Sequence, residues 1–305
     1  MRIAVIDLGT NTFNLLVGEL QDSQFVPLFH DKKGVMLGEG GINSGTIAPA
    51  AYQRALDAIK AHHISIKRLD VQQVRAIGTS AIRSADNGSL LVQDIRRMYG
   101  IEVDVIDGHR EAELIFKGVS YSLEDNDAVS LIMDIGGGSN EFIICRKGEM
   151  LWKRSFPLGM SRVLDRFRPS DPISEKEHGL VERFFEEGLV ELWNACEAYK
   201  PQVLIGASGA FDTYRNVLFF GNDPAHPTCI IPLSKFYDMH NVFLRSTLVE
   251  RRAIRGMDEL RVVMIVLASM LISLVLRKTN IQALIQSNYS LKEGVVVEML
   301  DHIKI

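Results

Sequence analysis

The 305-residue chain contains little cysteine, and its cysteines and histidines form no pattern that would build a metal site. Its three cysteines, Cys145, Cys196 and Cys229, are odd in number, and none belongs to a Cys-x-x-Cys pair. This scarcity argues against a disulfide framework and predicts free thiols in a reducing compartment. The N-terminus runs directly into strand-like residues, without the basic, apolar and small-residue succession of a signal peptide. We therefore expect a cytoplasmic protein.

The sequence also lacks a strong charge of either sign and a hydrophobic run long enough to cross a membrane. Its net charge of −4 argues against general binding to nucleic acid or membrane surfaces, but it leaves room for a local basic cleft. The apolar stretch 262–276 is shorter than the roughly 20 residues that a span requires, and we interpret it as a buried helix. Candidates for guiding a polyanion, or simply solvated charges, are Lys153, Arg154, Arg162, Arg251, Arg252 and Arg255.

One short pattern occurs twice in the chain. Residues 5–12 read VIDLGTNT and residues 132–139 read IMDIGGGS. Each copy is an apolar run followed by Asp-x-Gly-x-x-hydroxyl, and each leads into a second apolar run. The two aspartates, Asp7 and Asp134, lie 127 positions apart, which is about one domain length. The repeat predicts a duplicated fold with a phosphorylated ligand between its halves.

Strands alternate with helices along both halves, which predicts an α/β fold. We expect strands over 2–20 (a hairpin), 71–77, 102–106, 129–133, 142–145 and 203–205. Helices are expected over 49–67, 89–99, 109–119 (capped by Asp107), 174–199 and 262–276, with a last helix from about 290. The polar segment 122–128 is the predicted boundary. It gives one domain over 1–124, to which the C-terminal helix 290–305 is a candidate addition, and a second over 125–289.

The two turns have the chemistry of a phosphate site. Their glycines let backbone N–H groups approach phosphate oxygens without a Cβ in the way. The phosphate-binding candidates are Gly9, Thr10, Asn11, Thr12, Gly136, Gly137, Gly138 and Ser139. Asp7 and Asp134 repel phosphate, so their predicted role is to hold a divalent cation that bridges to it. A single such turn would be an ordinary hairpin, and it is the second copy that favours a phosphate site.

Eight segments together resemble the exopolyphosphatase / guanosine pentaphosphate phosphohydrolase (Ppx/GppA) family. They are VIDLGTNTF (5–13), LGEG (37–40), GTSAIRSADN (78–87), REAELIFKGV (110–119), MDIGGGSNEF (133–142), FPLG (156–159), GASGAFD (206–212) and SNYSLKEG (287–294). The resemblance covers nearly the whole chain and is closest to the short members, which lack extra C-terminal helical domains. It implies two duplicated actin-like (ribonuclease H-like) domains with a cleft between them, as in the actin, sugar kinase and Hsp70-like ATPase superfamily.

The resemblance also implies roles for individual residues. Glu111, before the Leu-Ile pair, is similar to the glutamate that activates water in the family, which distinguishes it from the neighbouring Glu113. Its alternative role is a first-turn glutamate favoured by the helix dipole. Arg83 is implied to bind phosphate, with an ion pair as the alternative. Glu141 is implied to join Asp7 and Asp134 as a ligand of Mg²⁺.

Three further segments have open roles. Gly206, Ser208 and Gly209 match the loop that approaches a nucleotide or the distal phosphates in the superfamily, or they form a plain strand-to-helix turn. Thr79, Ser80 and Asn87 either line the same cleft or cap and turn the chain. Lys292 stands in a Lys-Glu-Gly segment similar to the family's Arg-Glu-Gly, where a structural role at a helix start is equally open. The chain departs from the family's usual residues at Met36, Asn140, Val263, Asn288 and Ser290.

These observations favour a Mg²⁺-dependent exopolyphosphatase that hydrolyses the terminal phosphate of inorganic polyphosphate. Within the same chemistry, the alternative substrate is the 5′ phosphate of the alarmone guanosine pentaphosphate. A kinase or ATPase of the same superfamily and a non-catalytic sensor of polyphosphate or alarmone are the remaining alternatives. The resemblance makes a homodimer plausible.

Overall fold

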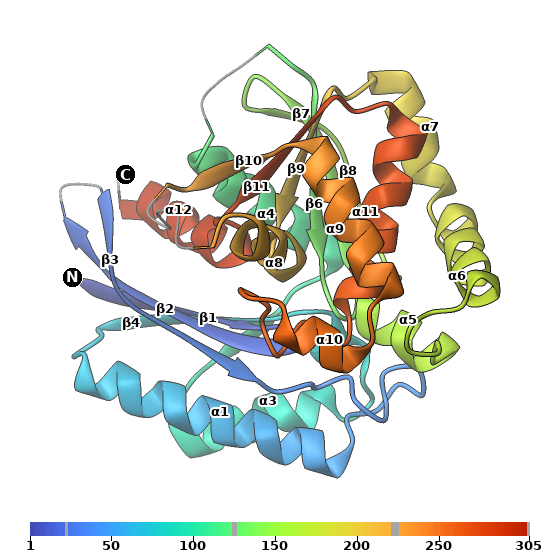
Figure 1. Ribbon diagram of the computed structural model, residues 1–305. Helices are drawn as coiled ribbons and strands as arrows, with labels where there is room; N and C mark the ends of the chain where they lie inside the picture. The colour runs from blue at the N-terminus through green and yellow to red at the C-terminus, as the bar shows by residue number, and fades with distance from the viewer. Residues whose placement is uncertain (22–23, 124–126, 221–225, 304–305) are drawn as a thin grey trace.

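The computed structural model describes residues 1–21, 24–123, 127–220 and 226–303, which fold around two mixed β-sheets (Figure 1). The first sheet has the strand order β3-β2-β1-β4-β5 and the second has the order β10-β11-β9-β6-β7-β8. Elements of the first half are β1 (Arg2–Leu8), β2 (Thr12–Gln21), β3 (Gln24–Gly34), α1 (Pro49–Arg68), β4 (Gln73–Gly78), α2 (Ser80–Ser84), α3 (Gly88–Tyr99) and β5 (Val103–Val105). The connecting helix α4 (Gly108–Tyr121) follows them.

The second half repeats the first with one strand added. Its elements are β6 (Ser130–Ile135), β7 (Asn140–Arg146), β8 (Glu149–Phe156), α5 (Met160–Phe167), α6 (Glu175–Gly188), α7 (Val190–Tyr199), β9 (Val203–Ala207), α8 (Gly209–Leu218), β10 (Thr228–Ile231), α9 (Leu233–Arg245), α10 (Leu248–Ala253), α11 (Ile265–Thr279), β11 (Ala283–Ser287) and α12 (Leu291–Ile303).

The two sheets share the same topology over five strands. In the first, β1, β2 and β3 form an antiparallel meander, β4 pairs with β1 in parallel, and β5 pairs with β4 in parallel. In the second, β6, β7 and β8 form the same meander, followed by the parallel strands β9 and β11, and β10 adds an antiparallel edge. Parallel neighbours require long crossover connections, which the helices provide. The predicted α/β class and its duplication are confirmed.

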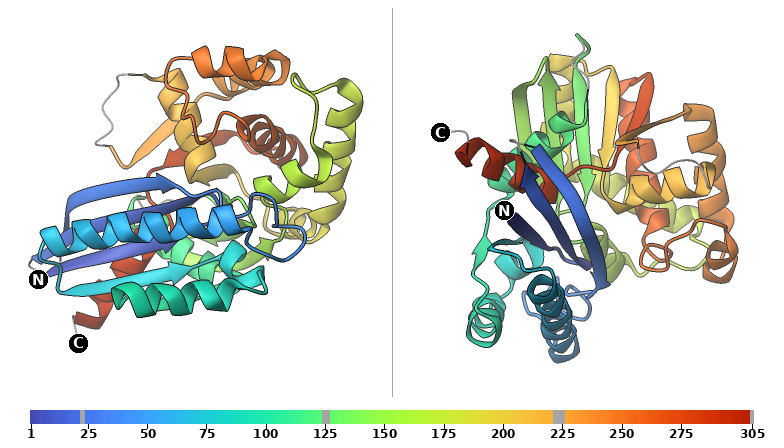
Figure 2. Two further views of the ribbon diagram at one scale, coloured as in Figure 1. Left: turned by 90° about the horizontal axis from the view of Figure 1, so that it is seen from below. Right: turned by 90° about the vertical axis from the view of Figure 1, so that its left-hand side faces the viewer.

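Each half has its own core. Helices α1 and α3 lie side by side over the outer face of the first sheet, with buried residues such as Ile59 and Ile95 beneath them (Figure 2). In the second half, α11 is buried along every position from Ile265 to Leu276. This confirms that the apolar stretch is a buried helix. Within the described ranges, no helix is both long and apolar enough to cross a membrane.

Helices α4 and α12 lie between the two sheets and join their cores. The shared cluster contains Val5 of β1, Ile115 of α4, Ile132 of β6 and Val295 of α12. The helices cross very closely, because a Cβ on Gly118 would overlap the carbonyl oxygen of Ser290. The predicted boundary at 124/125 lies outside the described residues, so the division into 1–124 and 125–289 stays a prediction.

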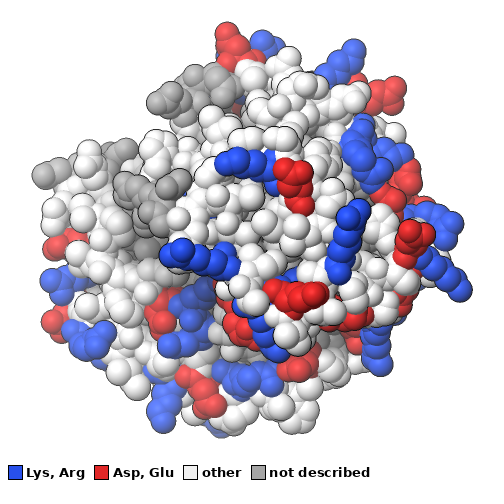
Figure 3. All heavy atoms as spheres, in the orientation of Figure 1, with Lys and Arg blue, Asp and Glu red and all other residues white. Residues whose placement is uncertain are grey.

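The exposed charges are mixed in sign. On the face shown in Figure 3, Lys and Arg side chains are interspersed with Asp and Glu over both halves. Cys145, Cys196 and Cys229 are all free, the first two buried.

Candidate functional site

The second glycine turn is supported from behind by the start of α5. The carbonyl oxygens of Gly136 and Gly137 accept the backbone N–H groups of Met160 and Ser161, each at 2.9 Å. The carbonyl oxygen of Gly138 accepts Nε of Arg162 at 2.8 Å. In a trans peptide the N–H points opposite to the C=O. The N–H groups that follow these three carbonyls therefore point away from the start of α5 and the Arg162 side chain, and the turn lines a cavity.

The first turn is supported in the same way by the segment after β3. The carbonyl oxygen of Thr10 accepts the N–H of Leu37 at 2.7 Å, and that of Asn11 accepts the N–H of Met36 at 3.0 Å. Each turn also contains the same internal hydrogen bond: the N–H of Gly9 donates to the carbonyl oxygen of Thr12, and that of Gly136 donates to the carbonyl oxygen of Ser139. The LGEG segment (37–40) thus begins at Leu37, which donates to the first turn, and the FPLG segment (156–159) directly precedes Met160, which donates to the second turn.

The two turns are in contact across the molecule. A Cβ on Gly137 would lie 2.6 Å from Nδ2 of Asn11, and one on Gly138 would lie 2.8 Å from Oγ1 of Thr10. Asn11 also accepts a hydrogen bond from the Ser161 hydroxyl at 2.7 Å. Glycine at positions 137 and 138 is therefore required by the close approach of the halves, in addition to any approach of a ligand.

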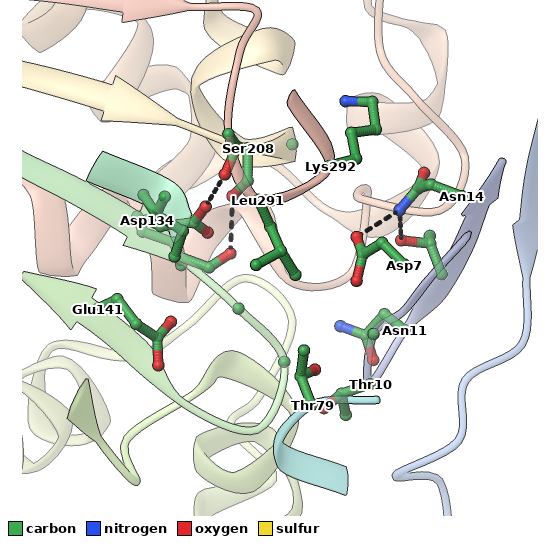
Figure 4. Close-up of a pocket in the computed structure, with 18 of the residues that line it drawn as sticks. Asp7, Thr10, Asn11, Asn14, Thr79, Asp134, Glu141, Ser208, Leu291 and Lys292 are labelled. Atoms are coloured by element: carbon green, nitrogen blue, oxygen red, sulfur yellow. Dashed lines mark hydrogen bonds between the residues drawn. The ribbon is translucent and has the colours of Figure 1, made fainter. Parts of the chain in front are cut away.

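Five carboxylates line a cavity of about 180 Å³ between the turns (Figure 4). They are Asp7, Glu111, Asp134, Glu141 and Asp212. Burial raises the pKa of every one, that of Asp7 to about 6 and that of Glu141 to about 7. Such a set of buried acids disfavours full ionisation unless cations enter the cavity.

Strand register places Asp7 and Asp134 at matching positions of the two hairpins. Asp7 lies opposite Asn14 in the first hairpin, and Asp134 lies opposite Glu141 in the second. The Asn14 amide donates to Asp7 at 3.1 Å, whereas the second hairpin has two facing carboxylates. Hydroxyl groups hold these two: Ser155 donates to Glu141 at 2.6 Å, and Ser290 donates to Asp134.

The residues present fit a divalent cation, although their side chains do not form a complete set of metal ligands. Within residues 1–21, 24–123, 127–220 and 226–303, no three Asp, Glu, His or Cys side chains form a group spaced to hold a metal. Asp134 and Glu141 are buried acids facing each other, and the charge of Asp134, after burial, raises the pKa of Glu141. Carboxylate oxygens are the ligands that Mg²⁺ prefers, and a cation there would relieve this repulsion.

Glu111 lies in the first turn of α4 and is only 7% exposed. The Asp107 side chain caps this helix by accepting the N–H of Arg110 at 2.8 Å, as predicted. Burial, and secondarily the charge of Glu141, raises the pKa of Glu111 well above its ordinary value, and the cation of Arg83 opposes the rise. Glu113 differs, since hydrogen bonds from Lys153 and then Arg110 lower its pKa.

Arg83 contacts Glu111 and is not among the described residues that line the cavity. Its Nη1 atom lies 3.2 Å from Oε2 of Glu111 and donates to the carbonyl oxygen of Ile106 at 2.6 Å. The arrangement matches the ion-pair alternative for this arginine. The phosphate-binding role of Arg83 stays a prediction.

Two residues of the GASG segment (206–209) line the cavity, whereas Gly206 packs in the core. Ser208 and Gly209 line the cavity, and the Ser208 hydroxyl donates to the carbonyl oxygen of Ile135 at 3.1 Å. Gly206 lies in β9, where a Cβ would overlap the ring of Phe211. Gly206 is therefore placed as a packing glycine of the β9–α8 connection.

Of the other residues whose roles were left open, some line the cavity and one has a structural role. Thr79 and Ser80 line the cavity. Asn87 instead exchanges hydrogen bonds with the backbone of Ile47, each at 2.9 Å, so it has a structural role. Lys292 lines the cavity, where the Glu293 carboxylate raises its pKa although burial opposes this.

Sequence reasoning missed several residues of the cavity. His30 and Lys32 come from one face of β3, Asp212 from α8, and Arg261 from the loop before α11. Lys32 pairs with Asp258 of the second half at 2.7 Å. In the described part of the chain, Nε of Arg261 is buried without a hydrogen-bond partner. The alternation of His30 and Lys32 in the sequence was a signal for a shared strand face.

Comparisons with known proteins show the family and the fold of the chain. The family model described as the Ppx/GppA phosphatase family matches residues 16–303. The crystal structure of an exopolyphosphatase from Cytophaga hutchinsonii is similar, with 43% sequence identity and a TM-score of 0.95 over 99% of this chain and 98% of that one. The Aquifex aeolicus member of the family has 23% identity and a TM-score of 0.83 over 100% of this chain and 99% of that one, a likeness of fold.

Curated relatives are more distant. The guanosine-5′-triphosphate,3′-diphosphate pyrophosphatase of Photobacterium profundum is 26% identical over 99% of this chain. The chain spans 60% of the length of that relative. The family model covers nearly the whole chain from residue 16 onward, including the second turn, Glu111 and the α4–α12 pair. The chain therefore belongs to the Ppx/GppA phosphatase family.

Proposed function

We propose that this protein is a metal-dependent exopolyphosphatase, which releases the terminal phosphate of inorganic polyphosphate by attack of water. The observation that carries the proposal is the position of Glu111, a buried carboxylate held by Arg83 at the edge of a cavity with two supported glycine turns. Membership of a phosphatase family supports hydrolysis as the reaction class.

Each part of the cavity has a distinct task in this reaction. Backbone N–H groups of both turns bind phosphate oxygens, and the Thr10 and Ser139 hydroxyl groups add donors. Glu111 accepts the proton of the attacking water, and a raised pKa makes its carboxylate a stronger base near neutral pH. Asp134 and Glu141, with Asp7 across the cavity, would hold Mg²⁺, which neutralises phosphate charge when bound.

Polyphosphate is favoured over guanosine pentaphosphate by the lining of the cavity. Among its described residues there is no Phe, Tyr or Trp, so His30 and Arg261 are the planar groups on which a guanine could stack, and the aliphatic contribution is limited to Ile115, Ile135 and Leu291. The similar structure from Cytophaga hutchinsonii, called an exopolyphosphatase, supports the same choice. The curated relatives named for the guanosine compound keep guanosine pentaphosphate as the second candidate substrate.

A substrate panel tests the proposal. Phosphate release is measured with Mg²⁺, and with EDTA in its place, from polyphosphate, guanosine pentaphosphate and ATP. We expect Mg²⁺-dependent release that is fastest from polyphosphate. Preference for guanosine pentaphosphate would select the second candidate, and turnover of ATP alone would favour a kinase or ATPase. Binding of polyphosphate with no release from any substrate would contradict hydrolysis and favour a sensor.

A further inference from the structure

Arg162, the third residue of α5, connects the second glycine turn to the first half of the molecule. Its Nε donates to the carbonyl oxygen of Gly138 at 2.8 Å. Its two terminal nitrogens donate to the carbonyl oxygen of Ile42 at 2.8 Å and to the Ser84 hydroxyl at 2.9 Å. Ile42 and Ser84 both belong to the first half, so one guanidinium bridges the cleft through three hydrogen bonds.

Among the described residues, no carboxylate forms an ion pair with Arg162. The three acceptors of its guanidinium are neutral, and the charged group that acts on it is another cation, Arg83. Burial, and after it the repulsion of Arg83, lowers the pKa of Arg162, while an arginine stays protonated in proteins. A positive charge thus lies directly behind the turn and is available to an anion in front of it.

The bond to Gly138 transmits this charge through a peptide group. The carbonyl of Gly138 and the N–H of Ser139 belong to one trans peptide, so drawing electron density toward the carbonyl oxygen makes the N–H a stronger donor. That N–H points away from the Arg162 guanidinium, and Ser139 lines the cavity. We propose that Arg162 is a positioning residue for phosphate binding, which polarises and fixes the Gly138–Ser139 peptide without touching the substrate.

The inference rests on the proposed function only for the class of ligand, so binding can test it without turnover. The affinity for inorganic phosphate is measured by calorimetry at fixed Mg²⁺ for the wild type, R162M, R162K and R162Q. R168M is the matched control, because Arg168 directly follows the last residue of the same helix, its side chain is 80% exposed, and its ion-pair partner among the described residues is Asp165. Thermal unfolding of each variant is followed in parallel, and KM and kcat for tripolyphosphate are measured where activity is found.

We expect R162M and R162Q to weaken phosphate binding about tenfold or more, the usual effect of losing a charge-assisted hydrogen bond. R162K keeps the charge and should lose about threefold or less, and R168M should bind as the wild type does. KM for tripolyphosphate should rise as phosphate affinity falls, while kcat changes little. If R162M fails to fold, R162Q decides, since its amide can still donate to Gly138 without the charge.

Two results would overturn the inference. One is wild-type phosphate affinity in R162Q. The other is equal weakening in R162K and R162Q in proportion to their loss of thermal stability, which would make Arg162 merely structural. Failure of the proposed function is distinguishable, because it would appear as absence of hydrolysis. A protein that hydrolyses no substrate can still lose phosphate affinity in R162Q.

Discussion

Arg83 and Glu111 form an ion pair of 3.2 Å, and the same guanidinium nitrogen donates to the carbonyl oxygen of Ile106. The arginine is therefore fixed to the backbone that leads into α4 as well as to the side chain in the first turn of that helix. This arrangement fixes the direction of the Glu111 carboxylate and limits how far burial can raise its pKa.

Loss of this partner should change the pH dependence of the reaction. Arg83→Met removes the cation that lowers the pKa of Glu111, so the acid limb of kcat against pH should move to higher pH and the rate at neutral pH should fall. Arg83→Lys keeps the charge and should shift the limb less. The measurement is kcat and KM for polyphosphate across pH. An unshifted limb with a raised KM would return Arg83 to phosphate binding.

The half-buried acid Asp7 should make folding stability depend on pH. Burial raises its pKa to about 6 from an ordinary value of 3.8, so its contribution to stability is fully present below about pH 4 and is lost as the pH rises through 6. Asp7→Asn removes this loss. Without Mg²⁺, the stability of the variant relative to the wild type should therefore increase between pH 4 and pH 7, by up to about 3 kcal/mol. Denaturant unfolding at several pH values measures the difference, and a constant difference would contradict the account.

Contact between the two turns should make Gly138 intolerant of a side chain. A Cβ there would lie 2.6 Å from Oγ of Ser80 and 2.8 Å from Oγ1 of Thr10, which forces the halves apart. We expect Gly138→Ala to cost about 1–3 kcal/mol in the free energy of unfolding and to lower kcat/KM for polyphosphate at least about a hundredfold. The matched control is Gly179→Ala in α6, where nothing lies within 4 Å of the new Cβ. This change should leave activity intact and stabilise the helix by up to about 1 kcal/mol. Equal effects of both changes would be evidence against contact between the turns.

Local signals in the sequence predicted the turns, the Asp107 cap and the buried helix α11, because each depends on neighbours along the chain. The strand β3 was not predicted, because its charged segment at 30–33 has no apolar alternation; among the described strands it lies at the edge of the sheet, beside β2. Contacts between the halves, such as Gly137 against Asn11, have no local pattern at all. Similarly, the motif at Arg83 indicated a residue type suited to phosphate, but only the fold showed its proximity to Glu111.

The most direct test of the account is the rate of phosphate release from polyphosphate by Glu111→Gln and Glu113→Gln beside the wild type. The two glutamates lie two positions apart on α4, but Glu111 lines the cavity and Glu113 pairs with Lys153 and Arg110. We expect Glu111→Gln to lower kcat by about 10²–10⁴ while phosphate still binds, and Glu113→Gln to stay close to the wild type. A wild-type rate in Glu111→Gln would contradict the account.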